Sequence, residues 1–380
     1  MSPQQINVAR LVEVGKPLEV GTADKPVPAR DDVLVKVDSC GLVPNSANIV
    51  RGAMEGRFPL PPLPAIFGLD ASGTVEAVGE RVFNVKVGDR VYVNPHLTCG
   101  TCAHCRAGGQ EQLLCPDFAL RAYFAGTEAG MRHFDHYPYG ALSQYLLSPA
   151  NKVAVLADSI RLEEAARFGY VGTSYGALKK AALGPGKTLL INGVTGTLGV
   201  AAVALALGMG ATKILGIGRN PDRLEQARKL APAGSSRVET RSSEDEGDLG
   251  EWVKSHTDGL GVDIVYDCLG VGGDAETSAT LLRTALKPGG RIILAAGGAE
   301  GEIGQSYAEF QMRSTPILGS TWITDGDLDE MIALIGTGVV DLSFLEHKAF
   351  PLDEVNEAFE FVGDRPGGFV NVAVKLHCGP

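Results

Sequence analysis

Residues 189–199 read LLINGVTGTLG, and this stretch decides the fold. Its first four residues are typical of a buried strand, and three glycines follow at intervals of three residues. A run of alanine, valine and leucine to residue 207 then predicts a helix. A glycine turn between strand and helix lets the backbone approach a pyrophosphate, and the helix N-terminus offers N–H donors and partial positive charge. The segment predicts a dinucleotide site made of Gly193, Thr195, Gly196, Thr197, Leu198 and Gly199.

Around this turn, apolar strand cores alternate with helical patterns. We expect strands at 189–192, 214–217, 264–266 and 292–295 and helices at 162–183, 198–207, 221–230 and 275–285. This alternation predicts a doubly wound parallel sheet with helices on both faces, and so the α/β class. Residues 1–155 differ, because short β-branched runs at 33–37, 73–78 and 90–93 stand between glycine and proline turns. They predict an irregular β body, and the strand-like end at 370–376 follows mixed strand and helix.

The end of the second strand of this sheet bears on the choice of cofactor. An acidic residue about 20 positions after the glycine turn would accept a hydrogen bond from the ribose 2′-hydroxyl of NAD. This strand instead ends in Gly218, Arg219 and Asn220, with Asp222 and Arg223 following. Arginine forks onto a phosphate, which favours the 2′-phosphate of NADP. NAD stays possible, since Arg219 could stack on adenine and Asp222 could serve a ribose.

Four of the seven cysteines fall within 17 residues, at Cys99, Cys102, Cys105 and Cys115. Two-residue gaps let a turn present neighbouring sulfurs, and four thiolates suit a tetrahedral zinc without an open position. We therefore predict one structural zinc. An iron–sulfur cluster is the alternative, although the last gap of nine residues is longer than its usual three. Cys40, Cys268 and Cys378 are expected to be bystanders.

Composition excludes several other classes of protein. With 34 Lys+Arg against 45 Asp+Glu, the net charge is −11, a poor match to nucleic acid. The hydrophobic share of 44% without long charge blocks excludes disorder. Glycines interrupt the most apolar stretch, so we expect no membrane partner, and no secretory signal stands at the N-terminus. The clustered cysteines suit a reducing compartment, and we expect a cytoplasmic protein.

The β body, the cysteine lobe and the glycine turn together resemble the medium-chain dehydrogenase/reductase superfamily, which includes the zinc alcohol dehydrogenases. Further stretches carry the resemblance: Gly68-x-Asp70-x-x-Gly73, Val87-Gly88-Asp89-Arg90-Val91, Thr173-x-Tyr175 and Leu286-Lys287-Pro288-Gly289-Gly290. The resemblance implies a GroES-like domain at 1–170 and 320–380, with the zinc lobe at 95–117. It implies a Rossmann domain at 171–319 and adds Thr173 to the cofactor site. It also implies a small-molecule substrate and a homodimer or homotetramer.

The zinc alcohol dehydrogenases of this family carry a second, catalytic zinc, and this chain departs from them there. The positions of its three ligands fall on Val43, Leu69 and Gly169, none of which offers a side-chain lone pair. A shifted register would place Cys40 at the first position, but one thiolate and Asp70 make a poor zinc site. The family's proton-relay positions fall on Asn45 and Asn48. We therefore predict an active site without catalytic zinc, as in quinone oxidoreductases and enone reductases.

Other groups must then polarise the substrate. Asn45 and Asn48 can donate to an oxyanion or can hold a loop, and Asp70 can orient a neighbour or be a satisfied buried acid. Tyr170, beside the lost third ligand, is the better candidate acid. His133 or His136, in the aromatic segment 117–140, could also supply a proton, and Trp322 could line a substrate pocket, an oligomer contact or the core.

Three functions stay open at this point. The first is NADPH-dependent reduction of an activated double bond or carbonyl without catalytic zinc. The second is an alcohol dehydrogenase or carbonyl reductase that works by hydrogen bonding alone. The third is a non-catalytic sensor that kept the nucleotide-binding fold.

Overall fold

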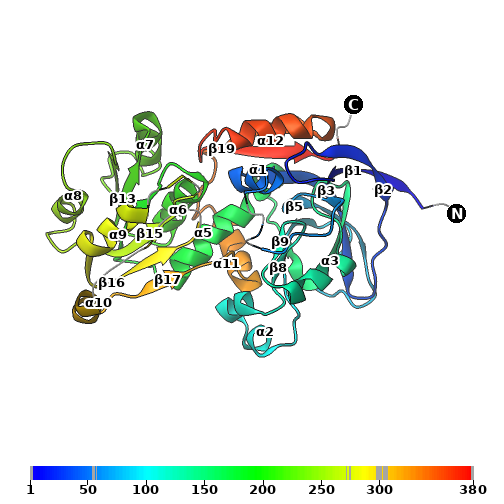
Figure 1. The fold of residues 1–380 in the computed structure, drawn as a ribbon, viewed down its shortest axis with the longest axis horizontal. Helices are drawn as coiled ribbons and strands as arrows, with labels where there is room; N and C mark the ends of the chain where they lie inside the picture. Colours follow the sequence, from blue (N-terminus) through cyan, green and yellow to red (C-terminus); the bar gives the residue numbers. More distant parts are fainter. Residues whose placement is uncertain are drawn as a thin grey trace.

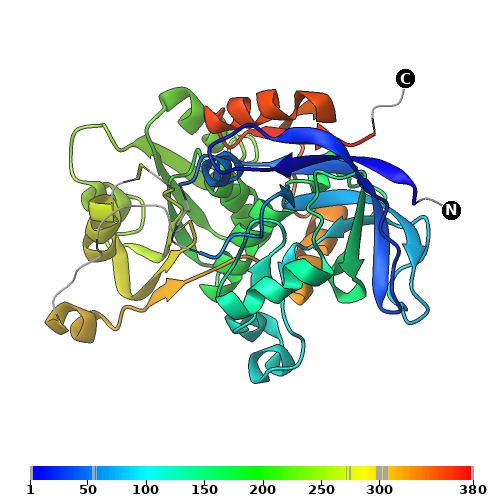
Figure 2. The ribbon, with the colours of Figure 1, turned by 45° about the vertical axis from the view of Figure 1, so that its right-hand side comes forward.

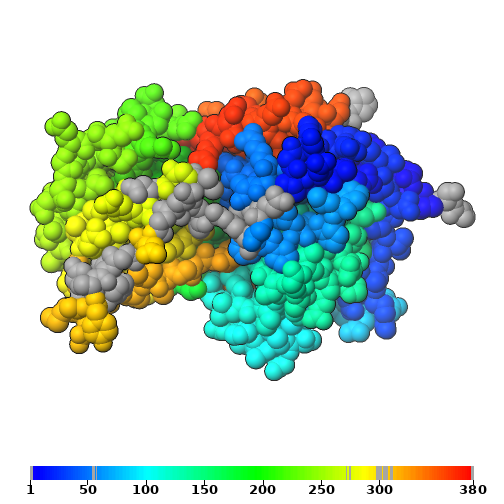
Figure 3. Space-filling model, in the orientation of Figure 1, coloured from blue at the N-terminus to red at the C-terminus, as the bar shows by residue number. Residues whose placement is uncertain are grey.

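The computed structural model describes residues 3–53, 56, 58–270, 272–273, 275–296, 302 and 307–377. Two bodies lie side by side along its longest axis (Figure 1). The glycine turn precedes α6 (Thr197–Gly208) in one of them, and α2 (Ala103–Ala107), which carries Cys105, lies at the lower edge of the other (Figures 1 and 3). This is the combination of a GroES-like β body with a Rossmann-like parallel sheet that the sequence predicts.

The β body is built on a long, mostly antiparallel sheet with the strand order β11-β6-β5-β3-β19-β18, and β10 pairs with β3. A smaller sheet, β2-β1-β4, lies beside it. The strands are β1 (Gln5–Leu11), β2 (Glu19–Asp24), β3 (Asp32–Leu42), β4 (Ala65–Ile66), β5 (Asp70–Val78), β6 (Arg90–Val93), β10 (Tyr145–Pro149), β11 (Val153–Val155), β18 (Glu346–Pro351) and β19 (Val370–Lys375). Helices α1 (Pro44–Val50) and α12 (Val355–Gly363) pack on each other over one side.

Short elements carry the cysteine lobe and the segment after it. They are β7 (His96–Leu97), α2 (Ala103–Ala107), β8 (Ala119–Leu120), β9 (Phe124–Ala125), α3 (His133–His136) and the 3-10 turns η1 (Gly109–Leu114) and η2 (Glu128–Arg132). Two further 3-10 turns, η3 (Ala150–Lys152) and η4 (Leu352–Glu354), join strands and helices of the β body.

The second body is a parallel sheet with the order β14-β13-β12-β15-β16-β17. Its strands are β12 (Thr188–Asn192), β13 (Lys213–Gly218), β14 (Val238–Ser242), β15 (Val262–Asp267), β16 (Leu286–Leu294) and β17 (Ile317–Gly319). Its helices are α6 (Thr197–Gly208), α7 (Pro221–Arg228), α8 (Leu249–Ser255), α9 (Ala275–Thr284) and α10 (Tyr307–Arg313). Every residue of β15 is buried, as expected for a strand covered on both faces.

The structure differs from the predicted elements in three places. The helix expected at 162–183 is two helices, α4 (Leu162–Ala165) and α5 (Phe168–Lys180), and the buried Arg167 stands at the break. Strand β14 and helix α8 were not expected, because their polar residues hide the apolar period. Strand β16 begins at Leu286 instead of 292, since an irregularity against β15 accommodates its Pro-Gly-Gly stretch.

Two segments cross between the bodies. Helix α5 leads from the β body into the parallel sheet, and residues 320–324 lead back from β17 to α11 (Asp325–Gly336) (Figure 2). Helix α11, which directly follows residues 320–324, packs against α5. The candidate site lies where they meet.

Candidate active site and metal centre

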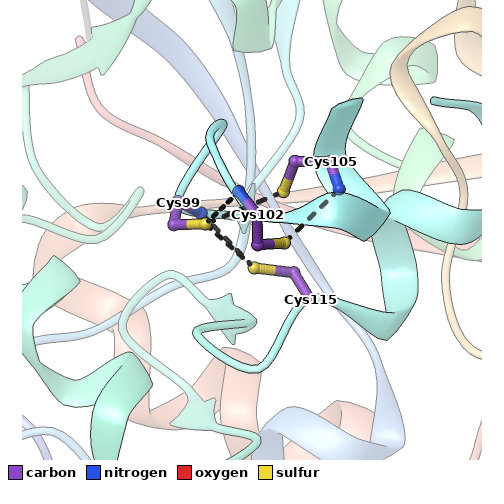
Figure 4. A group of neighbouring side chains, drawn as sticks. All are labelled: Cys99, Cys102, Cys105 and Cys115. Carbon is purple, nitrogen blue, oxygen red and sulfur yellow. Dashed lines mark hydrogen bonds between the residues drawn. The ribbon is translucent and has the colours of Figure 1, made fainter. Parts of the chain in front are cut away.

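The four cysteines of the lobe converge as one cluster (Figure 4). Their sulfurs all lie within 4.8 Å of one another, with Cys99 Sγ at 3.6 Å from Cys115 Sγ and 4.0 Å from Cys105 Sγ. A tetrahedron with Zn–S bonds of about 2.3 Å has sulfurs about 3.8 Å apart. The cage therefore fits a single zinc ion, and a multi-iron cluster needs a wider one.

Backbone N–H groups of the lobe prepare these sulfurs for a cation. The Cys102 N–H donates to Cys99 Sγ and the Cys105 N–H to Cys102 Sγ, each at 3.4 Å. The pKa of Cys99 falls to about 6, chiefly because the Thr101 N–H favours the thiolate. Among the described cysteines, Cys40 and Cys268 lie outside the cluster, and Cys378 lies outside the described residues.

The glycine turn has the geometry that a pyrophosphate site requires. Gly193 has a φ of +92°, in the left-handed region that favours glycine. A Cβ on Gly199 would lie 2.3 Å from the carbonyl oxygen of Gly193, so the helix can start this close to the turn only without a side chain. Gly196 is the N-cap of α6, whose first residues are Thr197, Leu198 and Gly199. The N-terminus of α6 could therefore hold a dinucleotide.

The other predicted cofactor residues have mixed surroundings. Arg219 is exposed at the end of β13, beside Gly218, where its guanidinium can reach a ligand. The Asn220 side chain caps α7 by accepting from the Arg223 N–H at 3.0 Å. The Arg223 guanidinium donates to the Pro366 carbonyl at 2.9 Å. Asn220 and Arg223 thus have structural contacts already, and their cofactor role stays a prediction.

Helix α5 runs past the glycine turn, and its contacts differ from expectation. The Thr173 hydroxyl donates to the Gly169 carbonyl within the helix at 2.9 Å. The next residue, Ser174, reaches α6 by donating to the Leu198 carbonyl at 2.9 Å, and it contacts the Tyr266 hydroxyl at 3.0 Å. No motif singles out Ser174, since a single serine in a helix forms no pattern.

The three positions that the resemblance assigns to a catalytic zinc are buried, and Asp70, next to Leu69, pairs with Gly41 and contacts Gly169. A Cβ on Gly169 would lie 2.1 Å from Asp70 Oδ1 and 2.6 Å from Trp322 Cη2. The space that the side chain of a third zinc ligand would need at position 169 is therefore occupied by the Asp70 carboxylate and the Trp322 indole. Across the described part of the chain, the cysteine cluster is the one group of three or more Cys, His, Asp or Glu ligand atoms that could hold a metal. Val43, Leu69 and Gly169 do not fit a zinc ion.

Asp70 is 1% exposed at the start of β5 and is held on two sides. The Tyr92 hydroxyl donates to Asp70 Oδ1 at 2.5 Å, and the Gly169 N–H also donates to the carboxylate. Burial raises the pKa of Asp70 to about 7, although these two bonds and the charge of Arg167 oppose the rise. Cys40, the shifted-register alternative, is fully buried next to it, and burial raises the pKa of its thiol.

Tyr170 offers this region a phenolic hydroxyl. It is partly exposed, and its hydroxyl is hydrogen-bonded to the Asn45 side chain. Asn48 in turn donates to Asn45 Oδ1 at 3.3 Å. Burial and the charge of Asp70 raise the pKa of Tyr170, while Asn45 and the Arg167 guanidinium favour its phenolate. The structure thus brings the predicted Asn45, Asn48, Asp70 and Tyr170 together.

Several residues of this site had no signal in the sequence. The buried Arg167 donates to the Gly368 and Val370 carbonyls and acts electrostatically on Asp70 and Tyr170. Tyr123 donates to the Ser46 hydroxyl on α1. His133 and His136 lie elsewhere, on α3, where the charges nearest His133 are Asp117, Arg132 and His136.

Comparisons with known proteins agree with this architecture. The family described as "Alcohol dehydrogenase GroES-like domain" matches residues 29–158, and "Zinc-binding dehydrogenase" matches residues 197–337. A probable D-xylulose reductase A of Aspergillus fumigatus is 28% identical over 353 residues, which is 90% of each chain. Sorbitol dehydrogenase of Bacillus subtilis is 27% identical over all of this chain and 98% of its own.

A solved structure from Escherichia coli, described as an oxidoreductase/dehydrogenase of unknown specificity, superposes with a TM-score of 0.82. It is 25% identical, and the match covers 98% of this chain and 99% of that one. Among the described helices, none is both long and apolar enough to cross a bilayer. From the two domain matches and the shared architecture, the chain belongs to the medium-chain dehydrogenase/reductase superfamily of NAD(P)-dependent oxidoreductases.

Proposed function

We propose that this chain transfers hydride between NADPH and a small, already activated substrate, an electron-poor C=C bond or carbonyl, without a catalytic zinc. The observation that carries the proposal is the filled position at Gly169, where Asp70 and Trp322 take the volume of the third ligand. A Lewis acid stabilises the developing alkoxide of a simple ketone by several kcal/mol. Without that contribution, substrates whose negative charge is already delocalised are favoured.

The predicted binding residues assign a place to each part of the cofactor. The N-terminus of α6, with Gly193, Gly196 and Gly199, would hold the pyrophosphate. The exposed Arg219 would fork onto the 2′-phosphate. When bound, NADPH supplies a hydride, and the protein's own groups manage the oxyanion and the proton.

Tyr170 is the proton donor in this proposal. Addition of hydride at the electron-poor carbon leaves negative charge on the carbonyl oxygen, and the Tyr170 hydroxyl would donate to that oxygen. The proton leaves Tyr170 Oη for the product, so the substrate gains one hydride and one proton while NADPH becomes NADP⁺. Asn45 and the positive charge of Arg167 stabilise the phenolate until solvent reprotonates it.

Reduction of an unconjugated carbonyl by hydrogen bonding alone is a second candidate. It is favoured by the names of the relatives, which include a sorbitol dehydrogenase and D-xylulose reductases. NADPH labelled with deuterium at C4 separates the two on an enone. We expect the label on the β-carbon of a saturated product whose carbonyl is intact, and label on a carbinol carbon would refute alkene reduction.

Substitution of Tyr170 tests the assignment of the acid. We expect Y170F to lower kcat about 100-fold or more, because general acid catalysis contributes roughly that much. Tyr145 is a matched control, since it lies on β10 and Lys25 Nζ stands 3.8 Å from its ring centroid. Y145F should keep kcat within about twofold of the wild type. A Y170F variant with unchanged kcat would exclude Tyr170 as the donor.

Substitution of Arg219 tests the preference for NADP. A hydrogen bond to a charged group contributes about 1.5–3 kcal/mol, so R219A should raise KM for NADPH roughly 10- to 100-fold. KM for NADH should change little, because NADH has no 2′-phosphate. Equal effects on both cofactors would assign Arg219 to the adenine instead.

Binding of NADPH with no turnover on enones, quinones or aldehydes would favour the third function, a non-catalytic sensor.

A further inference from the structure

Trp322 has a backbone conformation that a bulky residue rarely adopts. Its φ is +58°, in the left-handed region, and it is 6% exposed in the segment that returns from β17 to α11. Such strain persists where surrounding contacts determine it and collects at functional sites. The contacts that hold Trp322 can be followed in two directions.

The first set of contacts is a buried polar network. The Trp322 indole N–H donates to Asn94 Oδ1 at 2.9 Å, and the Asn94 amide nitrogen donates to Asp325 Oδ1 at 2.9 Å. Lys152 Nζ donates to Asp325 Oδ2 at 2.6 Å. Asn94 is 0% exposed and the Lys152 side chain 2%. The carboxylate thus fixes which way the Asn94 amide points, and the amide oxygen fixes the indole.

His96 closes the same network from the side of the cysteine lobe. Its Nε2 lies 3.3 Å from Lys152 Nζ, and its Nδ1 lies 3.2 Å from the Asn94 amide nitrogen. Burial and the neighbouring Lys152 charge lower the pKa of His96, so the ring stays neutral. Asp325 is therefore the counter-charge of Lys152, and the pair cannot be lost singly without a penalty.

The second set of contacts is a row of glycines on α5. Gly169, Gly172 and Gly176 lie at positions i, i+3 and i+7, on one face of the helix. A Cβ on them would lie 2.6 Å from Trp322 Cη2, 2.8 Å from Ile323 Cγ2 and 2.9 Å from the Trp322 carbonyl oxygen, in that order. The segment 322–323 therefore lies directly on the helix backbone.

Trp322 reaches the candidate acid from this position. Its ring meets the Tyr170 ring edge to face, with centroids 6.2 Å apart and an interplanar angle of 84°. A tyrosine can donate to a substrate oxygen only while its ring is held at the correct angle. The polar network does not include Tyr170 itself. It ends on the Trp322 indole, whose ring contacts the Tyr170 ring.

We propose that Asn94, backed by Asp325 and Lys152, is a positioning residue that fixes the Trp322 indole and, through it, the Tyr170 hydroxyl. The part of this inference that concerns catalysis rests on the proposed role of Tyr170. The other part, the anchoring of Trp322, stands on the hydrogen bonds and the glycine row alone.

The chain has two tryptophans, so W252F leaves Trp322 as the one indole that emits. In this background, N94L removes the acceptor of the indole N–H with little change in volume. We expect the Trp322 emission to shift because its indole loses the acceptor, and we expect kcat to fall about 10- to 100-fold with KM for NADPH within about twofold. N7L is the matched control, because Asn7 is an exposed asparagine on β1 and is not part of this network. It should change neither readout.

Emission is recorded without substrate, so a wild type that turns over no substrate would refute the proposed function while the emission still tests the anchor. An unshifted emission in N94L would overturn the anchor. A shifted emission with unchanged kcat would overturn the positioning role. If N94L does not fold, as circular dichroism would show, W322F removes the same N–H donor and keeps a ring. It should reproduce the fall in kcat, and wild-type kcat in W322F would overturn the proposal.

Discussion

The cysteine lobe and the region around Gly169 stand at two positions where the family resemblance implies a metal, and the side chains at the two positions differ. In the lobe, four sulfurs lie within 4.8 Å of one another and backbone N–H groups point at them. Around Gly169, side chains without lone pairs stand at the ligand positions, and Asp70 with Trp322 fills the space. The lobe therefore offers four ligands with room for an ion between them, whereas Val43, Leu69 and Gly169 offer no side-chain ligand.

The largest effect is expected from breaking the lobe. C102S should lower the zinc content to none and reduce stability on the order of 4 kcal/mol, because a structural metal contributes directly to folding. Cys102 is also the N-cap of α2, a role that serine keeps, so the change isolates the loss of the metal. Zinc analysis and thermal unfolding measure it.

C268A is the control for this experiment, since Cys268 lies at the glycine turn and outside the cluster. It should leave the zinc content unchanged. A C102S variant that retains its zinc would show that the metal sits elsewhere.

A smaller effect is expected from adding one methyl group at the filled position. G169A should destabilise the chain by about 1–3 kcal/mol, because its Cβ would meet Asp70 Oδ1 at 2.1 Å and Trp322 at 2.6 Å. Gly326, in α11, has open space around a Cβ and is the helical control. G326A should be neutral or stabilise by up to about 1 kcal/mol, as helix propensity predicts. Chemical denaturation compares them, and equal stabilisation by both would mean that the volume at Gly169 is free.

The last prediction concerns the Asp70 carboxyl beside Gly169 and its effect on the pH dependence of stability. The pKa of Asp70 is raised to about 7, so the folded state holds this proton more tightly than the unfolded one. The stability that this preference contributes is complete in acid and is lost as pH rises toward 7, with a slope of at most about 1.4 kcal/mol per pH unit. D70N has no such proton, so the stability of the wild type relative to D70N should fall between about pH 4 and pH 7.

Tyr92 offers a second check on the same carboxyl. Its hydrogen bond lowers the pKa of Asp70, so Y92F should move the loss of stability to higher pH. Unfolding temperatures measured across this range would contradict the account if the wild type and D70N profiles ran parallel.

The parts of the fold and site that could be predicted are those written locally in the sequence. The glycine turn, each single strand predicted for the parallel sheet and the cysteine spacing depend on one short stretch of the chain, and the structure has them. That Val43, Leu69 and Gly169 stand at the ligand positions of a catalytic zinc stays a prediction from the resemblance. The assignment of 1–170 with 320–380 and 171–319 as domains stays a prediction, as do the roles of the individual site residues.

The remaining parts depend on contacts between distant segments. Arg167 is bound by carbonyls about 200 residues away, Asn94 meets Trp322 across 228 residues, and Tyr123 meets Ser46 across 77. The residues around Asn94 and Arg167 in the sequence do not indicate that these side chains bond Trp322 and the Gly368 carbonyl. The break between α4 and α5 has the same origin, because the buried Arg167 at that break bonds the Gly368 carbonyl.

The metal content of the purified chain tests the central claim most directly. Elemental analysis of protein produced with ample zinc should give one zinc per chain, held by Cys99, Cys102, Cys105 and Cys115. The same measurement on C102S should give none. Two zinc ions per chain in the wild type, with one retained in C102S, would place a metal at the position that Asp70 and Trp322 fill and would contradict the account.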